Sequence, residues 1–421
     1  MAETCGSRSF FVVSLFVFFV LILSCQAEQV GGNFKNDQSV VDVLAGKLKV
    51  ANAAWWGFER GDSTAAIQSA INSGASKVII PYMGSDWIVR PIRLVSNQEI
   101  VFEPGVVIAA KKGQFKGDHD SLFRAEQNKN ITLRGYGATW RMNKADYTDP
   151  NNYIKAEWRM GFMCLSSKNI KVLGLTIAGS GGDGIYLGNT AVEFIGKPAY
   201  NSDIVIKDCI FDNNYRQGIS VIGAENLLIE NCIFRNTSGT APADGIDFEP
   251  NSEDNKLTNC IVRNCVFENN DGCGVQVCVT HLSEKTEPVS VLIENCHIRS
   301  TKSWGFLVGT VRDEGVSGKI HYKNCTVENT GKGGFVIYDK PDGSLDIQFT
   351  NCKWKKPFLG ADEILDLHAP MTSIAIKGQD PAGKGATRFS NCYLFGAEEK
   401  QFFVPMELEK SDGIIRINDY K

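Results

Sequence analysis

Residues Asn201 to Asn251 read NSDIVIKDCIFDNNYRQGISVIGAENLLIENCIFRNTSGTAPADGIDFEPN and contain one pattern written twice. Each copy has a short apolar segment, a polar residue and a cysteine, a second apolar segment, a polar turn and a Gly-Ile pair. The first copy is IVIKDCIFDNNYRQGISV and the second is LLIENCIFRNTSGTAPADGIDF. The pattern continues as VRNCVFENNDGCGVQV, LIENCHIRSTKSWGFLV and IHYKNCTVENTGKGGFVI, and weakens in QFTNCKW and RFSNCYLF. Much of the chain is therefore a repeat array.

The repeat length narrows the fold class. Successive pattern cysteines are separated by 23, 33, 31, 29, 27 and 40 residues, and periods of about 20 to 50 residues indicate a solenoid, a propeller or another array. Each repeat holds three short strands and no helical period, which predicts one coil of a parallel β-helix. A propeller blade needs four antiparallel strands with hairpin turns, and hairpin signals are scarce here. The cysteines are Cys209, Cys232, Cys265, Cys296, Cys325, Cys352 and Cys392.

Stacked coils give these columns a structural role. Neighbouring coils lie about 4.8 Å apart, so equivalent residues lie above one another. We expect the cysteines to form a buried column of mostly free thiols, because stacked parallel positions are poorly oriented for disulfides. The residues before them form a second column, in which side-chain amides bond along the stack and tolerate left-handed backbone. That column is Asp208, Asn231, Asn264, Asn295, Asn324, Asn351 and Asn391.

The N-terminal residues predict export. Residues 1–27 contain Arg8, the apolar run SFFVVSLFVFFVLILS and a small-residue cleavage site ending at Ala27, which is typical of a signal peptide. An alternative is bacterial lipoprotein anchoring at Cys25. The apolar run is short for a membrane span. The formal net charge of −4 argues against a nucleic-acid partner, and it does not choose among glycan substrates. We expect a monomer.

After the signal peptide, the chain is expected to form three segments. Residues 28–60 are expected to pack on the cap and to include a short helix over 40–50. Residues 61–396 form the β-helix, opened by GDSTAAIQSAIN, an amphipathic capping helix with Asp62 or Ser63 as N-cap. Residues 397–421 form a C-terminal cap or tail. The polar and aromatic insertion over 141–160 either lines a sugar cleft or packs against the coils.

The capping-helix sequence, the Asn-Cys repeats and the X-Gly-Ile strands resemble the right-handed parallel β-helix superfamily of pectate lyases, polygalacturonases and alginate-active enzymes. The resemblance covers roughly residues 60–395. It implies a groove along one strand face that cleaves or epimerises acidic or complex polysaccharides. Gly181-Gly182-Asp183-Gly184 is similar to one polygalacturonase motif, but Arg216-Gln217 and Asp244 replace the other two. Only Asp183 therefore matches that family's catalytic set by position.

The strand that follows each polar turn supplies the candidate site. Aligned on its glycine, the alternation places Ile185, Ile219 and Ile246 inside and turns Asp247 outward. Asp183 and Asp244 precede glycines two coils apart, about 9.6 Å at two strand spacings. Clustered carboxylates repel, so at least one should hold a proton and serve as a general acid. Predicted substrate contacts, all on or beside this face, are Arg216, Gln217, Tyr186, Glu249, Gln276 and Trp304.

Three functions are compatible with these residues. The first is a secreted glycoside hydrolase that uses Asp183, Asp244 and Asp247; a separation of about 6.5 to 9.5 Å would suit inversion. The second is a polysaccharide lyase or epimerase acting on uronates, with Arg216 or a histidine such as His281 or His321 as base and optional calcium held by the acids. The third is a non-catalytic glycan-binding β-helix. No cofactor is expected apart from that optional calcium.

Overall fold

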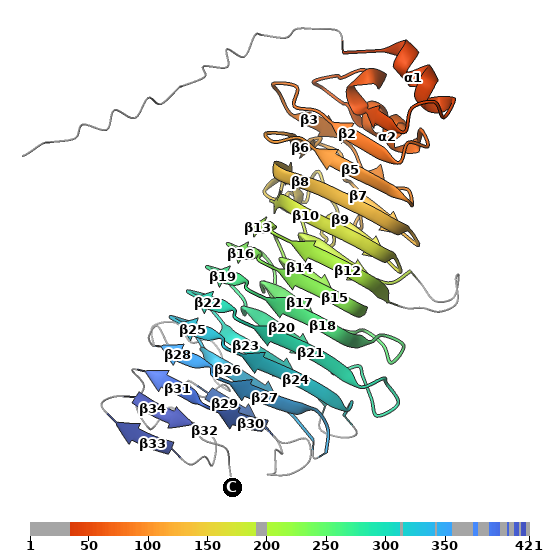
Figure 1. Ribbon diagram of the computed structural model, residues 1–421. Coiled ribbons are helices and arrows are strands. Elements are labelled where there is room, and N and C mark those ends of the chain that lie inside the picture. Colours follow the sequence, from red (N-terminus) through yellow and green to blue (C-terminus); the bar gives the residue numbers. More distant parts are fainter. Residues whose placement is uncertain are drawn as a thin grey trace, which may run out of the picture. The chain divides into compact units, whose positions relative to one another are not determined.

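The computed structural model describes residues 34–190, 200–311, 315–341, 343–355, 374–377, 387–395, 402–403, 408–411 and 414–417. Residues 1–27 and Cys25, on which the export predictions depend, lie outside this range. The chain divides into the units Met1–Asn33 and Phe34–Lys421, and all described residues belong to the second. This second unit is a right-handed parallel β-helix whose coils follow one another in sequence order (Figure 1).

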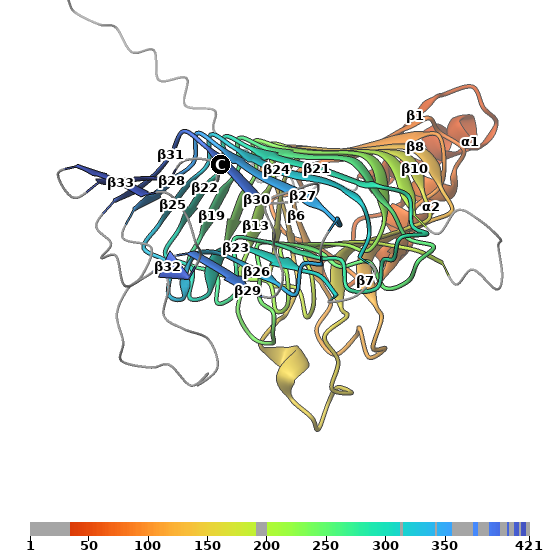
Figure 2. The same ribbon diagram turned by 90° about the horizontal axis from the view of Figure 1, so that it is seen from below.

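Each coil contributes strands to three walls, which enclose the core when the coils are viewed along their stacking direction (Figure 2). Walls 1 and 2 belong to one continuous sheet, because β8 and β10 run through the bend between them and pair with strands of both walls. Wall 1 contains β1 (Val50–Asn52), β2 (Lys77–Ile80), β5 (Gln98–Phe102), β8 (Lys129–Arg141), β10 (Lys168–Ala178), β12 (Asn201–Lys207), β15 (Ala224–Glu230), β18 (Leu257–Arg263), β21 (Val289–Glu294), β24 (Gly318–Lys323), β27 (Asp346–Thr350) and β30 (Thr387–Ser390).

Wall 2 consists of short strands that precede wall 3 in each coil. It contains β3 (Trp87–Val89), β6 (Val107–Ala110), β13 (Ile210–Asp212), β16 (Ile233–Arg235), β19 (Val266–Glu268), β22 (His297–Arg299), β25 (Thr326–Glu328), β28 (Lys353–Lys355) and β31 (Cys392–Phe395). Wall 3 is a separate parallel sheet. It contains β4 (Ile92–Arg93), β7 (Ser121–Glu126), β9 (Met160–Leu165), β11 (Ile185–Gly188), β14 (Ile219–Val221), β17 (Ile246–Phe248), β20 (Val275–Cys278), β23 (Trp304–Gly309), β26 (Gly333–Tyr338), β29 (Ile374–Lys377) and β32 (Phe402–Phe403).

The bend between walls 1 and 2 explains both predicted columns. The seven pattern cysteines are buried, and the described cysteines are free thiols. The residues before them have φ between +51° and +57°, where asparagine and aspartate are tolerated better than most residues. Each amide in this ladder donates to the preceding coil; for example, Asn295 Nδ2 donates to Asn264 Oδ1 at 3.1 Å. Both columns are therefore structural, as predicted. Inside, Phe211, Phe234 and Phe267 stack at 4.8 and 4.9 Å.

The two ends of the β-helix differ. At the first coil lies α2 (Thr64–Asn72), which buries Ile67 and Ile71; the Asp62 carboxylate accepts the Thr64 N–H at 3.1 Å. The earlier helix α1 spans Asp37–Leu44 rather than 40–50. The helix starts before residue 40 because the Asn36 side chain caps its N-terminus. The last residue of the predicted range, Val50, is the first residue of β1. Two short 3-10 helices are η1 (Ala53–Trp56) and η2 (Asp146–Thr148).

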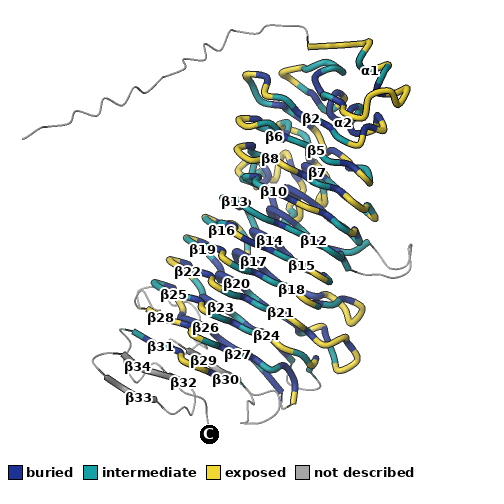
Figure 3. Tube along the Cα trace, in the orientation of Figure 1, coloured by how far each residue is buried: buried dark blue, intermediate teal, exposed yellow. Residues whose placement is uncertain are grey.

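The described strands near the C-terminus change direction. β34 (Ile414–Ile417) pairs antiparallel with both β31 and β33 (Leu408–Ser411). At the N-terminal end, β1 already pairs with β2, although it precedes the boundary expected at residue 61. Along the walls, buried and partly exposed residues alternate, while exposed residues gather at the turns (Figure 3). No helix of the described residues is long and apolar enough to span a membrane.

Candidate functional site

The candidate site lies on wall 3, where the predicted register is present. Ile185, Ile219, Ile246 and Val275 pair in succession and are fully buried in the core. The residues after them, Tyr186, Ser220, Asp247 and Gln276, also pair in succession and alternate to the outer face.

Glycine is required before these strands because two elements approach closely there. A Cβ on Gly184 would lie 2.7 Å from the Gly218 carbonyl oxygen and 2.7 Å from the Phe211 ring. The Gly184 N–H donates to the carbonyl of Gln217, and the Gly218 N–H donates to that of Asp244. The residues that precede the glycines are therefore stacked on adjacent coils. Asp183, Gln217 and Asp244 occupy these positions, so the repeat register brings them together.

The three predicted catalytic acids are clustered but are covered. Asp183, Asp244 and Asp247 each have 0% exposure, whereas a carboxylate in an open groove would be accessible. Both oxygens of Asp183 and Oδ2 of Asp244 lack a hydrogen-bond partner among the described residues. Asp247 differs, because its two oxygens accept from the side-chain amides of Gln217 at 2.9 Å and Gln276 at 3.1 Å. The cluster thus contains buried carboxyl oxygens that accept no hydrogen bond from the described residues.

Gln217 was predicted to contact substrate, and its side chain is fully buried like those of the three acids. Its Nε2 donates to Asp247, and its Oε1 accepts the backbone N–H of Asp244 at 2.7 Å. Gln217 therefore positions two acids from adjacent coils, and its amide is already engaged on both sides.

Arg216 links the buried acids to partly exposed ones. Its Nη2 donates to Glu249 Oε2 at 2.9 Å, and its Nη1 lies 3.8 Å from Asp183 Oδ1. Nη1 also donates to the Ser220 hydroxyl at 3.2 Å. The Arg216 side chain is 12% exposed, compared with 31% for Glu249. The guanidinium therefore lies between the deepest carboxyl and the surface.

Burial controls the protonation of this cluster. Loss of solvation raises the pKa of Asp183 to about 7, although the Arg216 guanidinium opposes that rise. Burial also raises the pKa of Asp244 to about 8, against the hydrogen bond from the Cys273 N–H. The pKa of Asp247 is raised by burial and by the neighbouring Asp244. These carboxyls can therefore hold protons near neutral pH, which is the state that a general acid needs.

Apolar clusters flank the acids on the same wall. On the N-terminal side, the half-buried Tyr186 packs against Met160, Met163 and Leu165. Burial raises the pKa of Tyr186 to about 12, and Asp183 adds to the effect. On the C-terminal side, Trp304 packs with Cys273 and Val336. Trp304, which was predicted to contact substrate, is only 2% exposed in this cluster.

The insertion over 142–159 forms a lobe beside wall 3 (Figure 2). Tyr147 and Tyr153 are buried, and both rings lie within 5.5 Å of the buried Arg159 guanidinium, so they hold the lobe together. Trp158 is 38% exposed and stacks on His119 at 5.0 Å. Glu157 Oε1 lies 3.9 Å from Arg216 Nε. The sequence analysis missed Glu157, because no coil periodicity marks a residue of an insertion.

The acid cluster does not fit the optional calcium ion. No three His, Cys, Asp or Glu side chains are arranged to hold a metal within the described ranges. Asp247 accepts amide donors on both oxygens, and Arg216 brings a positive charge into the cluster. Calcium needs several oxygen ligands that face it together. We derive no step that uses this ion.

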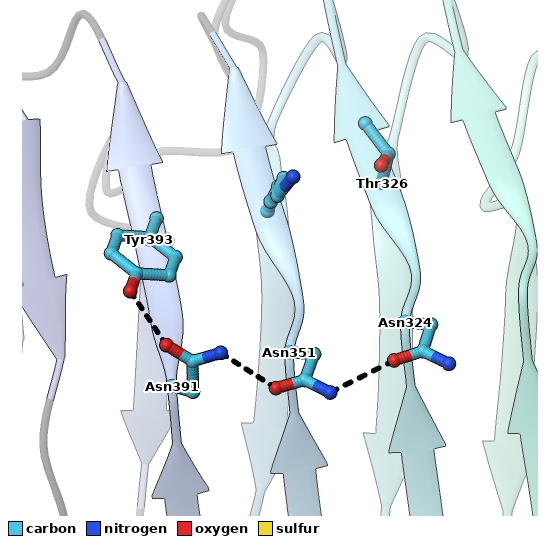
Figure 4. A pocket seen from close by; sticks show the side chains of 6 residues that line it. Asn324, Thr326, Asn351, Asn391 and Tyr393 are labelled. Carbon is cyan, nitrogen blue, oxygen red and sulfur yellow. Dashed lines mark hydrogen bonds between the residues drawn. The ribbon is translucent and has the colours of Figure 1, made fainter.

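A hollow of about 320 Å³ lies elsewhere, at the bend between walls 1 and 2, and exposes the amide ladder (Figure 4). Asn351 Nδ2 donates to Asn324 Oδ1 at 3.0 Å, and Asn391 Nδ2 donates to Asn351 Oδ1 at 2.8 Å. Tyr393 closes the row by donating to Asn391 Oδ1 at 2.6 Å. The amides that line this hollow already bond to one another, so we interpret the hollow as a feature of the bend and not as a ligand site.

Comparison with known proteins agrees with this architecture. The family described as right handed beta helix region matches residues 115–260 and 255–354, more than half of the chain. The chain belongs to this right-handed β-helix family. An uncharacterised protein of Bacillus subtilis (strain 168) is 25% identical over 222 residues, and the match covers 48% of this chain and 38% of that protein. The chain thus spans well under half the length of that curated relative.

Solved structures of other β-helix proteins share the fold. The family 28 exopolygalacturonase of Yersinia enterocolitica aligns with a TM-score of 0.54 at 14% identity, over 82% of this chain and 77% of that chain. The tailspike protein of E. coli bacteriophage HK620, solved with a pentasaccharide, aligns with a TM-score of 0.57 at 14% identity, over 86% and 65% of the two chains. At these identities the likeness concerns the fold alone.

Proposed function

We propose that the outer face of wall 3 binds a polysaccharide and that its buried acids catalyse hydrolysis of a glycosidic bond. The observation that carries this proposal is the pair Asp183 and Asp244, whose raised pKa values allow protonation near neutral pH beside the Glu249–Arg216 ion pair. A glycosidase needs one carboxylic acid and one carboxylate across the scissile bond. The named neighbours supply related support: one is an exopolygalacturonase and the other was solved with a pentasaccharide.

The reaction can be divided among these residues. A protonated Asp183 or Asp244 donates its proton to the glycosidic oxygen as the bond to the anomeric carbon breaks. A water molecule adds to that carbon and gives a proton to a carboxylate. Glu249, which is ion-paired and 31% exposed, is better placed for this than the covered Asp247. Gln217 and Gln276 hold Asp247, which keeps the cluster in register.

Access to Asp183 requires a rearrangement. Arg216 contacts Asp183 and the more exposed Glu249 and Glu157, so a sugar meets this ion-paired group before it meets the acid. Sugar hydroxyls can replace one of these contacts, since the guanidinium has five donors. Binding and uncovering of the acid would then occur together. A polysaccharide substrate also fits the export predicted from residues 1–27.

The lyase alternative is weaker on the same geometry. A β-elimination needs a base that has lost its proton. Burial lowers the pKa of Arg216, but the nearby carboxylates Asp183 and Glu249 raise it by more. The net pKa is therefore higher than usual, and the guanidinium stays protonated. The non-catalytic alternative has one observation in its favour, the complete burial of all three acids. It remains the second candidate function.

Activity screening with two variants tests the proposal. Wild type, Asp183→Asn and Asp244→Asn are incubated with neutral and acidic polysaccharides, and reducing ends and the ultraviolet absorbance of unsaturated products are recorded. Hydrolysis releases reducing ends without that absorbance, and each variant should lose at least about 100-fold in rate. Far-UV circular dichroism checks that the variants are folded. Undiminished turnover in both variants would refute the assignment, absorbing products would indicate a lyase, and glycan binding without turnover would indicate the non-catalytic candidate.

A further inference from the structure

The charges around Arg216 identify the kind of sugar that this site can accept. We propose that the sugar unit bound against Arg216 is uncharged, a neutral or N-acetylated hexose unit rather than a uronate. This inference rests on the proposed function, because it concerns the substrate of the same site.

The first argument is the excess of acidic groups. Arg216 faces Glu249 at 2.9 Å, Asp183 at 3.8 Å and Glu157 at 3.9 Å. Asp244 and Asp247 are fully buried in the same cluster. Arg216 therefore already faces two partly exposed carboxylates, Glu249 and Glu157, and has three buried acids beside it. A uronate carboxylate would have to displace Glu249 and then lie beside both of these carboxylates, which is unfavourable in a poorly solvated site.

The second argument is that two basic side chains near the acids, Lys302 and Lys144, already have partners. Lys302 is ion-paired with Asp271 at 2.8 Å. Lys144 donates to Asn213 Oδ1, the Asn214 carbonyl and the Ser238 hydroxyl at 2.9 to 3.1 Å. Along the wall itself, the outward positions from β11 to β20 are a tyrosine, a serine, an aspartate and a glutamine. Within the described residues, this stretch offers no cation for a carboxylate.

The third argument is that the groups present suit an uncharged sugar. The unpartnered oxygens of Asp183 and Asp244 can accept or donate hydrogen bonds to hydroxyl or amide groups, depending on their protonation. Partly exposed apolar side chains lie on either side of the acids along the wall: Tyr186 on one side, and Leu307 and Tyr338, which pack on the buried Trp304 cluster, on the other. Carbohydrate C–H faces pack on such surfaces while their hydroxyls bond to the polar groups between them. An uncharged unit can therefore contact both the apolar and the polar groups of this face.

A matched set of polymers tests the inference. Acidic polysaccharides are assayed before and after chemical reduction of their carboxyl groups to primary alcohols, which leaves the backbone linkages unchanged. Neutral and N-acetylated polysaccharides complete the panel. We expect kcat/KM to be at least about 100-fold higher on a reduced polymer than on its acidic parent. Faster cleavage of an acidic parent than of its reduced form would overturn the inference.

Binding measurements separate this inference from the proposed function. Affinity electrophoresis of Asp183→Asn reports glycan binding without cleavage. Affinity for uncharged glycans should change less than about twofold between 0.05 and 0.5 M NaCl, because no ion pair with the ligand is formed. Glu249→Gln removes one acid and should improve binding of acidic polymers relative to neutral ones.

The outcomes are distinct. Uncharged glycans that are bound but never cleaved refute the hydrolase and leave the ligand class standing. Uronate cleavage that depends on Asp183 and Asp244 refutes the ligand class and leaves the hydrolase standing. Failure to bind or cleave any glycan of the panel, charged or uncharged, refutes both.

Discussion

Replacing Asp183 by Asn should stabilise the protein at alkaline pH and leave its stability nearly unchanged at acidic pH. Asp183 is fully buried, and both carboxyl oxygens lack a hydrogen-bond partner among the described residues. Asn has nearly the same shape as Asp but carries no charge. It therefore removes the cost of ionising this buried group and disturbs the packing little.

The size of the effect follows from linkage. The pKa of Asp183 rises from 3.8 to about 7 on folding, chiefly because of burial. Between these values the folded state keeps a proton that the unfolded state has lost, so the free energy of unfolding falls as pH rises. A shift of about 3 pH units at about 1.36 kcal/mol per unit gives about 4 kcal/mol. This loss starts near pH 4, is complete near pH 7, and is absent in Asp183→Asn.

Urea unfolding at pH 4 and at pH 8, followed by far-UV circular dichroism, measures the effect. The matched control is Asp37→Asn, because the Asp37 side chain is 79% exposed. Relative to wild type, Asp183→Asn should gain about 4 kcal/mol between the two pH values, whereas the control should change by less than about 0.5 kcal/mol. An equal difference from wild type at both pH values would refute the protonation of Asp183 that underlies the proposed acid catalysis.

Two further predictions concern the packing of the coils and the ligand surface. Gly274→Ala should destabilise the fold by about 1 to 3 kcal/mol, because the new Cβ would lie 2.8 Å from the Gly305 carbonyl oxygen and 2.6 Å from Ile298. Urea unfolding midpoints measure this loss of stability. Gly61→Ala is the control that should be unaffected, because a Cβ on Gly61 meets nothing within 4 Å. Trp158→Ala should raise KM about fivefold and leave kcat within about twofold, since loss of one stacking contact is worth about 1 kcal/mol; an unchanged KM would exclude the exposed indole from the ligand surface.

The fold was predictable because its signals are local and repeated. Seven successive coils repeat an asparagine or aspartate with left-handed backbone followed by a small buried thiol, and glycines before the wall 3 strands, such as Gly184, Gly218 and Gly274, mark contacts that exclude a Cβ. Period-two alternation then placed the core and outer faces of wall 3 correctly. Helix α1 was predicted less accurately because the Asn36 cap precedes the apolar residues that suggested the helix.

The site was predictable in its membership and less so in its exposure. Register alone brought Asp183, Asp244 and Asp247 together, but the coverage of a side chain depends on neighbours that the repeat does not specify. Gln217 turned out to hold two acids, and Trp304 to be buried in an apolar cluster. Glu157 reaches Arg216 from an insertion whose path no periodicity describes.

Because the coils stack in register, lateral positions on wall 3 change only in steps of one strand spacing, about 4.8 Å. Moving an acid to an adjacent coil would alter its separation from a partner by one such step, whereas moving it along its own strand by one residue would turn it into the core. Evolution of a catalytic pair on this scaffold is therefore a choice among a few discrete separations. Fine adjustment must come from side-chain length, as between aspartate and glutamate, or from insertions such as the one that carries Glu157.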